Sequence, residues 1–264
     1  MIAEMTWEQV DLTAAEADLP VAVGGSLAPH RLLEALRHGA FPLPSAGDYG
    51  IEVNRILYSD YVDEGRISLF PTPHQEPDTD PYAVTWWCPP TRPVLPASSV
   101  RLPKRLKQDL RNKHPWITTC DHAFEEVVEQ CRDQRGIRWI TDELRDSLVD
   151  LHTAGWAHSV EVWSGAELIG GLFGTGMGGL FCAESMFHRR PDASKVAIAD
   201  LGRRLAAHQG ALIDVQMQSP ITTDLGAAPI SRTEFLDILG NVDLPLIPET
   251  GVLPVAPLGA TTNA

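Results

Sequence analysis

The sequence is poor in several features that mark common classes of protein. It has 4 cysteines in 264 residues, and no two of them form a C-x-x-C pair, so we expect free thiols rather than a disulfide framework. Its 9 histidines show no HExxH or similar ligand spacing, which argues against a metal site. The sequence has no apolar run long enough to span a bilayer. Its N-terminus lacks the basic segment and the following apolar segment of a signal peptide. We therefore expect a cytoplasmic protein with no metal, no other cofactor and no membrane partner.

The charge balance is acidic but uneven. A formal net charge of −14 argues against a general nucleic-acid binder. Residues 92–114, however, hold seven basic residues and one acid, so this segment carries +6 and the remainder −20. A basic stripe on an acidic protein is typical of localised phosphate contact. A solvated helix face explains the same pattern equally well at this point.

Composition divides the chain into three parts. Residues 1–92 predict a small N-terminal domain with an acidic excursion at 46–84, where eight acids stand against two basic residues. Within that excursion, Tyr49–Leu57 and Arg66–Phe70 could be short strands. A larger domain is expected over 93–240, after a proline-rich connector. Residues 241–264, which contain prolines and no basic residue, predict a loosely ordered tail.

The larger domain combines helical and strand patterns and predicts an α+β fold, in which a mixed, mainly antiparallel sheet is flanked by helices. Helical spacing of apolar residues occurs at 104–113, 121–132, 141–155, 194–209 and 231–239, and strand patterns occur at 159–163, 167–173, 180–187 and 211–217. The string GTGMGG at 174–179 resembles a dinucleotide-binding motif, but a strand follows it where that motif needs a helix. We expect it to be a loop between antiparallel strands.

Two of the apolar strands carry polar side chains in their middle. Glu184 lies within 179–187, and Asp214 and Gln216 lie two residues apart within 211–217, so that both should lie on one face of their strand. A carboxylate on an apolar strand is costly unless it is paired or used. Together the two strands predict a functional site. The alternative is that each carboxylate is only a structural hydrogen-bond acceptor.

Several strings, in order, resemble the bacterial leucyl/phenylalanyl-tRNA–protein transferases. They include GAFP at 39–42, WWCP at 86–89, WIT at 139–141, AHSVEVW at 157–163, ELIGG at 167–171, LFCAESMF at 180–187, ASK at 193–195 and LIDVQ at 212–216. The resemblance implies a small N-terminal domain followed by a GNAT-like acyltransferase domain. It also implies the reaction, transfer of Leu, Phe or Met from aminoacyl-tRNA to the N-terminal Arg or Lys of a protein, which marks that protein for degradation.

The resemblance also implies roles for individual residues. Asp214 and Gln216 match the pair proposed to act in the proton step, with Asp214 electrostatic and Gln216 orienting, and Glu184 matches the residue that holds the substrate. Trp139 and Ser185 match positions at the tRNA 3′ end. The acceptor-stem contacts would be Arg101, Lys104, Arg105, Lys107, Arg111 and Lys113. The donor side-chain pocket would be lined by Leu172, Phe173, Phe181, Met186, Ile198, Leu201, Leu205 and Ile213.

Some residues depart from the family pattern and leave rival functions open. The family string FPW is here Phe41-Pro42-Leu43, so one aromatic contact to the tRNA end is missing. That departure favours a non-catalytic tRNA- or N-degron-binding module of the same fold, whereas the retained Asp214 and Glu184 favour an enzyme. A GNAT enzyme that uses acetyl-CoA is a weaker rival, because the link 188–193 lacks the glycines that cradle a pyrophosphate.

Overall fold

The chain, seen here in a computed structural model, forms two compact units. The structure describes residues 5–71, 79–132, 139–240 and 244–260. The first unit comprises Met1–Thr91, Arg135–Leu151 and Ser231–Asn241, and the second comprises Arg92–Gln134, His152–Ile230 and Val242–Ala264. Both are built on mixed sheets flanked by helices, so the fold is α+β. The first unit thus includes 135–151 and 231–241 in addition to the N-terminal part of the chain.

The first unit has a four-stranded sheet of order β2-β4-β1-β3. Its strands are β1 (Ala22–Gly24), β2 (Phe41–Pro44), β3 (Ser68–Phe70) and β4 (Val84–Trp87). β1 pairs in parallel with β3, and the other two pairings are antiparallel. The Trp86 indole is buried and donates a hydrogen bond of 2.8 Å to the Gly24 carbonyl, so this sheet is tied together by a side chain as well as by its ladder.

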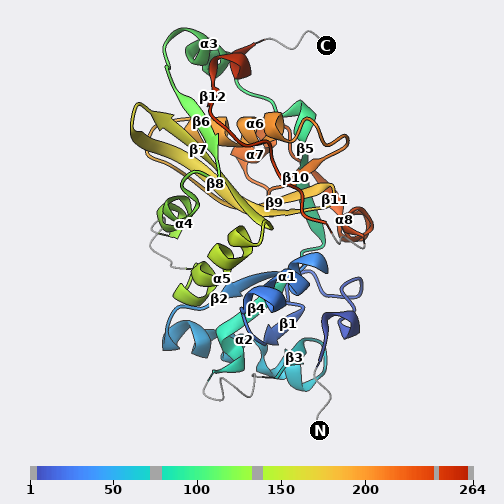
Figure 1. The fold of residues 1–264 in the computed structure, drawn as a ribbon. Helices are drawn as coiled ribbons and strands as arrows, with labels where there is room; N and C mark the ends of the chain where they lie inside the picture. Colours follow the sequence, from blue (N-terminus) through green and yellow to red (C-terminus); the bar gives the residue numbers. More distant parts are fainter. Residues whose placement is uncertain (1–4, 72–78, 133–138, 241–243, 261–264) are drawn as a thin grey trace. The chain divides into compact units, whose positions relative to one another are not determined.

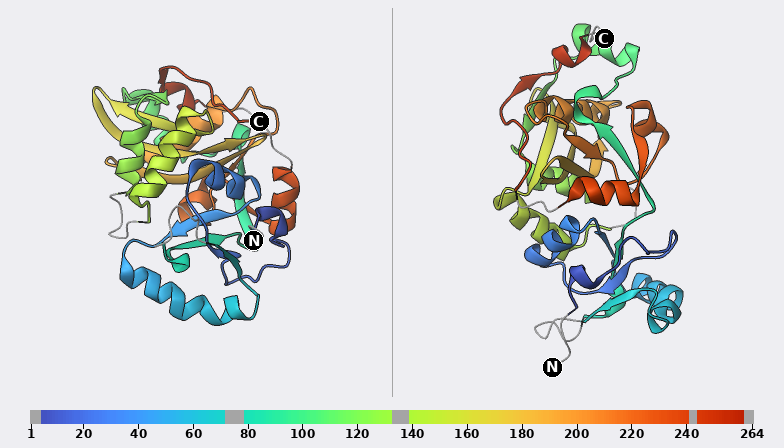
Figure 2. Two further views of the ribbon diagram at one scale, coloured as in Figure 1. Left: turned by 60° about the horizontal axis from the view of Figure 1, so that its bottom comes forward. Right: turned by 90° about the vertical axis from the view of Figure 1, so that its right-hand side faces the viewer.

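The acidic excursion is part of this unit. The expected strand over Tyr49–Leu57 is wrong: these residues lie in the helix α2 (Asp48–Asp63), which Figure 2 shows as a long helix of the first unit. The physical reason is spacing, because the apolar side chains recur along one helix face. Those side chains pack against buried residues of the unit. The helix contributes Ile51, Tyr58, Tyr61 and Val62, and the buried residues are Val23, Ile67 and Tyr82. The second expected strand is present as β3.

The remaining helices of the first unit begin at capping residues or proline. They are α1 (Pro29–Arg37), α5 (Asp142–Thr153), whose last residues belong to the second unit, and α8 (Arg232–Leu239), with 3-10 turns at Trp7–Gln9 and Pro81–Ala83. The Leu144 amide donates to the Thr141 hydroxyl at 3.2 Å, and the Glu234 amide donates to Ser231 at 3.1 Å. Each hydroxyl thereby satisfies an amide at a helix start.

The second unit has an eight-stranded sheet of order β11-β5-β10-β9-β8-β7-β6-β12. The strands are β5 (Thr91–Pro96), β6 (Ile117–Cys120), β7 (Ala157–Ser164), β8 (Glu167–Met177), β9 (Leu180–His188), β10 (Leu212–Asp214), β11 (Ala228–Ser231) and β12 (Leu253–Pro254). The helices are α3 (Lys104–Asn112), α4 (Phe124–Arg132), α6 (Ala193–Arg204) and α7 (Pro220–Asp224), with 3-10 turns at Ala97–Ser99 and Ala256–Gly259. β7, β8 and β9 form an antiparallel meander, and β10 joins β9 in parallel and β5 in antiparallel orientation.

Helices α6 and α4 cover opposite faces of the meander (Figure 1). A Cβ added at Gly170 would meet Ala193 of α6, whereas one added at Gly171 would lie 3.3 Å from Val127 of α4. Because successive strand residues point to opposite faces, the two helices lie on different sides of the sheet. The α6 side holds the main hydrophobic core of this unit.

The glycine string lies mostly inside a strand. β8 continues to Met177, so the expected loop over 174–179 is reduced to a turn at Gly178, whose φ of 56° favours glycine. The antiparallel pairing of β8 with β9 across that turn agrees with the prediction. Gly176 lies against the Leu246 carbonyl, where any Cβ would collide. Close backbone approach therefore accounts for glycine there.

The C-terminal segment is ordered where the structure describes it, so the expectation of a loosely ordered tail is wrong for residues 244–260. β12 pairs with β6, and Leu246 and Val255 are buried. The buried Arg204 guanidinium donates to the Glu249 carbonyl at 2.7 Å and to the Gly251 carbonyl at 3.1 Å. Buried side chains and hydrogen bonds to its backbone carbonyls hold this segment in place. Its proline content alone did not indicate these contacts. No helix among the described residues is both long and apolar enough to cross a membrane.

Candidate active site

The predicted polar residues meet where β9 and β10 part. The parallel ladder pairs Leu180 with Leu212, Phe181 with Ile213 and Cys182 with Asp214. β10 ends there, while β9 continues to His188. Phe181 and Ile213 are both in the core on the α6 side. Cys182 and Asp214, the next residue in each strand, therefore point to the opposite face.

Asp214 is paired with an arginine inside the protein. Arg92 of β5 donates to both carboxylate oxygens, from Nε at 3.4 Å to Oδ1 and from Nη2 to Oδ2. The relative exposure of the two side chains is 2% and 0%. β5 pairs with β10 so that Val94 lies opposite Asp214. A buried carboxylate that accepts from two nitrogens of a buried guanidinium is held in one position.

Gln216 reaches the site by a different route from the one predicted. The expected strand over 211–217 ends at Asp214, and Gln216 has a left-handed backbone with φ of 55°. Its backbone N–H donates to Asp214 Oδ1 at 2.8 Å, and its side-chain Nε2 donates to Glu184 Oε2. Asp214 thus sets the backbone that aims the Gln216 amide at Glu184.

Glu184 lies at a bulge in β9. Phe173 of β8 pairs with Ser185 and Gly174 pairs with Ala183, so Glu184 is the additional residue between two pairs. β-Bulges commonly re-aim a side chain beside an active site. The carboxylate accepts from Thr175 Oγ1 at 3.3 Å as well as from Gln216. The residue keeps partial exposure, as do Ala183, Ser185 and Met186.

Burial raises the pKa of the Glu184 carboxyl to about 7, and the negative charge of Asp214 acts in the same direction. Arg92 and the hydrogen bonds from Gln216 and Thr175 favour the ionised form and lower this pKa in part. A carboxyl poised near neutrality can accept or donate a proton under physiological conditions. Burial likewise raises the pKa of the adjacent Cys182 thiol well above its usual range, which argues against a thiolate nucleophile.

Most of the predicted donor-pocket residues form one cluster. Leu172, Phe181, Ile198, Leu201, Leu205 and Ile213 are at most 1% exposed and pack together on the α6 side. Met186 is partly exposed and packs against the same cluster. Phe173 differs, because its ring packs edge-on against Phe124 of α4, with centroids 6.2 Å apart. The structure therefore brings seven of the eight together.

The predicted tRNA residues occupy different parts of the fold. Lys104, Arg105, Lys107 and Arg111 lie on α3, with Arg101 before it and Lys113 after it, and all but the half-buried Lys107 are exposed. Trp139 is half-buried in the first unit, just before α5, and Ser185 is beside Glu184 in β9. A pocket of ≈ 540 Å³ lies beside α3 and is lined in part by Arg105, His114, Arg190 and Lys195. Arg190 and Lys195 were not among the predicted tRNA contacts.

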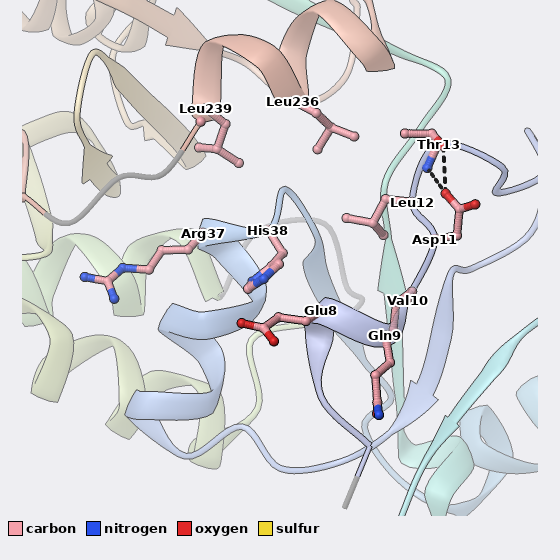
Figure 3. A pocket seen from close by; sticks show the side chains of 11 residues that line it. Glu8, Gln9, Val10, Asp11, Leu12, Thr13, Arg37, His38, Leu236 and Leu239 are labelled. Atoms are coloured by element: carbon pink, nitrogen blue, oxygen red, sulfur yellow. Dashed lines mark hydrogen bonds between the residues drawn. The ribbon is translucent and has the colours of Figure 1, made fainter.

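Another pocket lies in the first unit, away from any predicted residue. It has a volume of ≈ 490 Å³ and is formed by the segment 8–13, the end of α1 and one face of α8. Figure 3 shows Leu236 and Leu239 on one wall and Glu8, Arg37 and His38 on another. Its walls combine apolar side chains with charges of both signs, and they give no specific indication of a ligand.

Asp121, His152 and His158 form a cluster of metal-ligand residue types in the second unit, with ligand atoms within 4.8 Å of one another. The ring nitrogens mostly face hydrogen-bond acceptors. His158 Nδ1 lies 2.8 Å from Asp121 Oδ2 and Nε2 lies 3.2 Å from the Gly155 carbonyl, and His152 Nδ1 lies 2.8 Å from the Ala157 carbonyl. A nitrogen that faces a carbonyl carries a proton and has no lone pair for a metal. The cluster is built as a hydrogen-bond network.

Sequence reasoning missed two residues of the network. Arg92 was counted only as the edge of the basic stripe, although it directly precedes the apolar residues 93–95, and a charge beside an apolar strand is the signal that singled out Glu184. Thr175 lay inside the glycine string, where nothing in the sequence distinguished it. Each residue donates a hydrogen bond to a predicted carboxylate. Arg92 donates to Asp214, and Thr175 donates to Glu184.

Comparison with known proteins identifies the family. The profile of the leucyl/phenylalanyl-tRNA protein transferases matches residues 94–240. The leucyl/phenylalanyl-tRNA–protein transferase of Chromohalobacter salexigens is 38% identical over 246 residues, which are 92% of this chain and 82% of that protein. The corresponding protein of Shewanella sp. strain ANA-3 is 37% identical over 223 residues, 83% of this chain and 79% of its own.

A solved structure is also similar, at much lower identity. A conserved protein of unknown function from Bacteroides thetaiotaomicron aligns with 92% of this chain at 14% identity and a TM-score of 0.38, which does not establish a shared fold. The two named relatives are matched over more than four fifths of this chain, and their family is the one that the motifs resemble. The chain belongs to the leucyl/phenylalanyl-tRNA–protein transferase family.

Proposed function

We propose that this protein transfers leucine, phenylalanine or methionine from aminoacyl-tRNA to the N-terminal arginine or lysine of acceptor proteins. The acceptor would thereby be marked for degradation as an N-degron. The observation that supports this most is the hydrogen-bonded network in which buried Arg92 and Asp214 hold Gln216, and the partly exposed Gln216 meets the partly exposed Glu184.

The chemistry asks little of the enzyme beyond placement and one proton transfer. The aminoacyl ester of tRNA is already activated, and an α-amine with an ordinary pKa of about 7.7–8.0 is partly neutral at physiological pH. Holding the amine and the ester together removes most of the entropic barrier. In this proposal the hydrogen-bonded side chains of Gln216 and Glu184 together orient the acceptor amine.

The donor side chain would enter between the parting strands. Ala183, Met186 and Val215 belong to the segments where the two strands part; they are partly exposed and also pack against the buried cluster on the α6 side. An apolar side chain placed there would extend the core instead of facing water, as for any buried apolar group. The flexible, polarizable Met186 suits a pocket that accepts both a branched and an aromatic side chain.

The tRNA would be bound through its backbone. Basic side chains of α3 point outward from a helix whose Leu106 and Leu110 are buried, so their charges are available to phosphates. Contacts to backbone carry no sequence information, which suits an enzyme that accepts several tRNAs. Trp139 would stack on the terminal adenosine, an interaction of about 1–3 kcal/mol per base.

We also infer a GNAT-like architecture for residues 93–240. The antiparallel meander β7–β9, the crossover helix α6 and the parallel strand β10 support it. The link 188–193 carries no glycine, which disfavours the acetyl-CoA alternative. The smaller domain over residues 1–92 would then be an addition specific to the family.

The test is transfer of labelled leucine and phenylalanine from charged tRNA to a peptide with an N-terminal arginine, beside a matched peptide with an N-terminal aspartate. Transfer to the arginine peptide alone is the expected result. Transfer to both peptides would contradict the proposed acceptor specificity. Absence of transfer, with folded protein that still binds tRNA, would favour a binding module.

That binding module is the second candidate, and one observation favours it. Leu43 stands where the family has tryptophan, and its side chain is 39% exposed. An exposed leucine supplies no stacking surface for a base, so affinity for the tRNA end would be lower. The partly exposed Glu184, however, would have no evident use in a protein that only binds.

A further inference from the structure

The two carboxylates of the site are not equivalent. Asp214 is fully buried, both of its oxygens accept from Arg92, and Oδ1 also accepts from the Gln216 backbone. Glu184 is partly exposed, and its partners are the neutral groups of Gln216 and Thr175. Because Asp214 is shut off from solvent and engaged by Arg92, its carboxylate has no access to a substrate amine. The Glu184 carboxylate is partly accessible and is engaged in no ion pair with its hydrogen-bond partners.

We propose that Glu184 is the catalytic residue that takes the proton from the attacking α-amine, and that Asp214 and Arg92 are positioning residues. This inference rests on the proposed function. It goes beyond the role of substrate holding, and it moves the proton step away from Asp214. Gln216 links the two, because Asp214 fixes its backbone and its side-chain N–H group meets Glu184.

The proton and bond changes balance without a further reactant. The neutral amine nitrogen attacks the ester carbonyl carbon, and a C–N bond forms. That nitrogen gives up one proton, which Glu184 accepts. The C–O bond to the terminal ribose of the tRNA then breaks, and Glu184 returns the proton to the departing oxygen. The carboxylate is regenerated, and an amide and a ribose hydroxyl are the products.

The surroundings of Glu184 suit this role. The charged and titratable groups that face it are Asp214 on β10, Arg92 on β5 and Cys182 on β9. Burial and the Asp214 charge raise the pKa of Glu184 to about 7, close to that of the amine it would deprotonate. A base matched in this way transfers the proton in either direction at small cost.

The test is steady-state transfer over a series of N-terminal-arginine peptide concentrations, up to saturation, across pH 5.5–9, for the native protein and for Glu184→Gln. We expect a native rate that rises through an apparent pKa near 7, as long as the amine is kept saturating in its neutral form. Glu184→Gln should lower kcat roughly 10²- to 10⁴-fold, abolish that limb and leave the KM for the peptide nearly unchanged. Glu184→Asp should keep the limb at a reduced rate.

Glu161→Gln is the matched control. Glu161 is another strand carboxylate, fully buried in β7, where it accepts from Thr119 and Ser159. This variant should keep the limb near pH 7 even if it lowers stability. If Glu184→Gln raises only the KM, or keeps the pH limb, Glu184 holds the substrate and is not the base. Failure of the native protein to transfer at all would instead contradict the proposed function.

Discussion

Arg92 and Asp214 illustrate how a buried ion pair can fix the position of neighbouring polar residues. Both side chains are shut off from water, and the pair links β5 to β10. Burying two charges is expensive, and their attraction offsets that cost only while both are present. The pair therefore contributes little net stability, but it fixes the position of Asp214. Asp214 in turn holds the Gln216 backbone through a hydrogen bond.

Replacing one partner should destabilise the protein strongly. Asp214→Asn leaves the Arg92 charge buried beside a neutral amide, so we expect the free energy of unfolding to fall by about 3–5 kcal/mol. Urea denaturation followed by circular dichroism measures it. Glu167→Gln is the control, because it breaks the exposed Arg190–Glu167 pair and should cost at most about 1 kcal/mol. Equal effects of the two changes would contradict the importance of burial.

At the scale of elements, α3 uses one face for packing and presents basic side chains on the other. Leu106 and Leu110, four residues apart, fasten the helix to the core, and the residues between and around them are free to be basic. Asp109 partly offsets the charge, since its carboxylate lies 2.7 Å from Lys113 Nζ. The helix can therefore lose its charges without losing its packing, which makes it a clean target for substitution.

Removing charges from α3 should weaken tRNA binding in a salt-dependent way. We expect Lys104→Ala, Lys107→Ala and Arg111→Ala together to lower affinity for tRNA and to reduce the slope of log K against log salt by roughly 0.7–0.9 for each lost phosphate contact. Filter binding or fluorescence anisotropy at several salt concentrations measures it.

A matched set of changes separates local contact from overall charge. Arg31→Ala, Arg55→Ala and Arg145→Ala remove the same charge from helices of the first unit and should leave the slope unchanged. If both sets lower the slope alike, the response reflects net charge, and α3 is not the binding element.

The whole molecule carries a net charge of −14, yet its stability should respond to one carboxyl in particular. The pKa of Glu184 in the folded protein, about 7, is above its ordinary value of 4.5. The folded protein therefore binds this proton more tightly than the unfolded chain does. Its contribution to stability is complete below about pH 4.5 and is lost as the pH rises through 7.

We accordingly expect Glu184→Gln to remove a decline in stability between about pH 4.5 and 7, at about 1.4 kcal/mol per unit of pKa difference. The measurement is the free energy of unfolding across that range for the native protein and the variant. Glu161→Gln serves again as the comparison. Parallel curves for the native protein and Glu184→Gln would mean that Glu184 has an ordinary pKa in the folded state.

The sequence by itself determined the family, the fold class and the strands that carry Glu184 and Asp214. Apolar spacing and short motifs are local properties of the chain, so they can be recognised without knowing the tertiary structure. It also predicted most of the helices of the second unit, where the spacing was regular. It misjudged α2, because a short acidic stretch with scattered aromatic residues matches strand and helix patterns alike until packing chooses between them.

Only the tertiary structure decided which polar residues pair with one another. The pairing of Arg92 with Asp214 joins residues 122 positions apart, and the bulge at Glu184 depends on its register with β8. Neither can be read from local spacing. The same is true of the C-terminal segment. It is ordered because Arg204 donates a hydrogen bond to the Glu249 carbonyl and because β12 pairs with β6. Burial and register are properties of the assembled sheet, so the difference between Glu184 and Asp214 arises only in the fold.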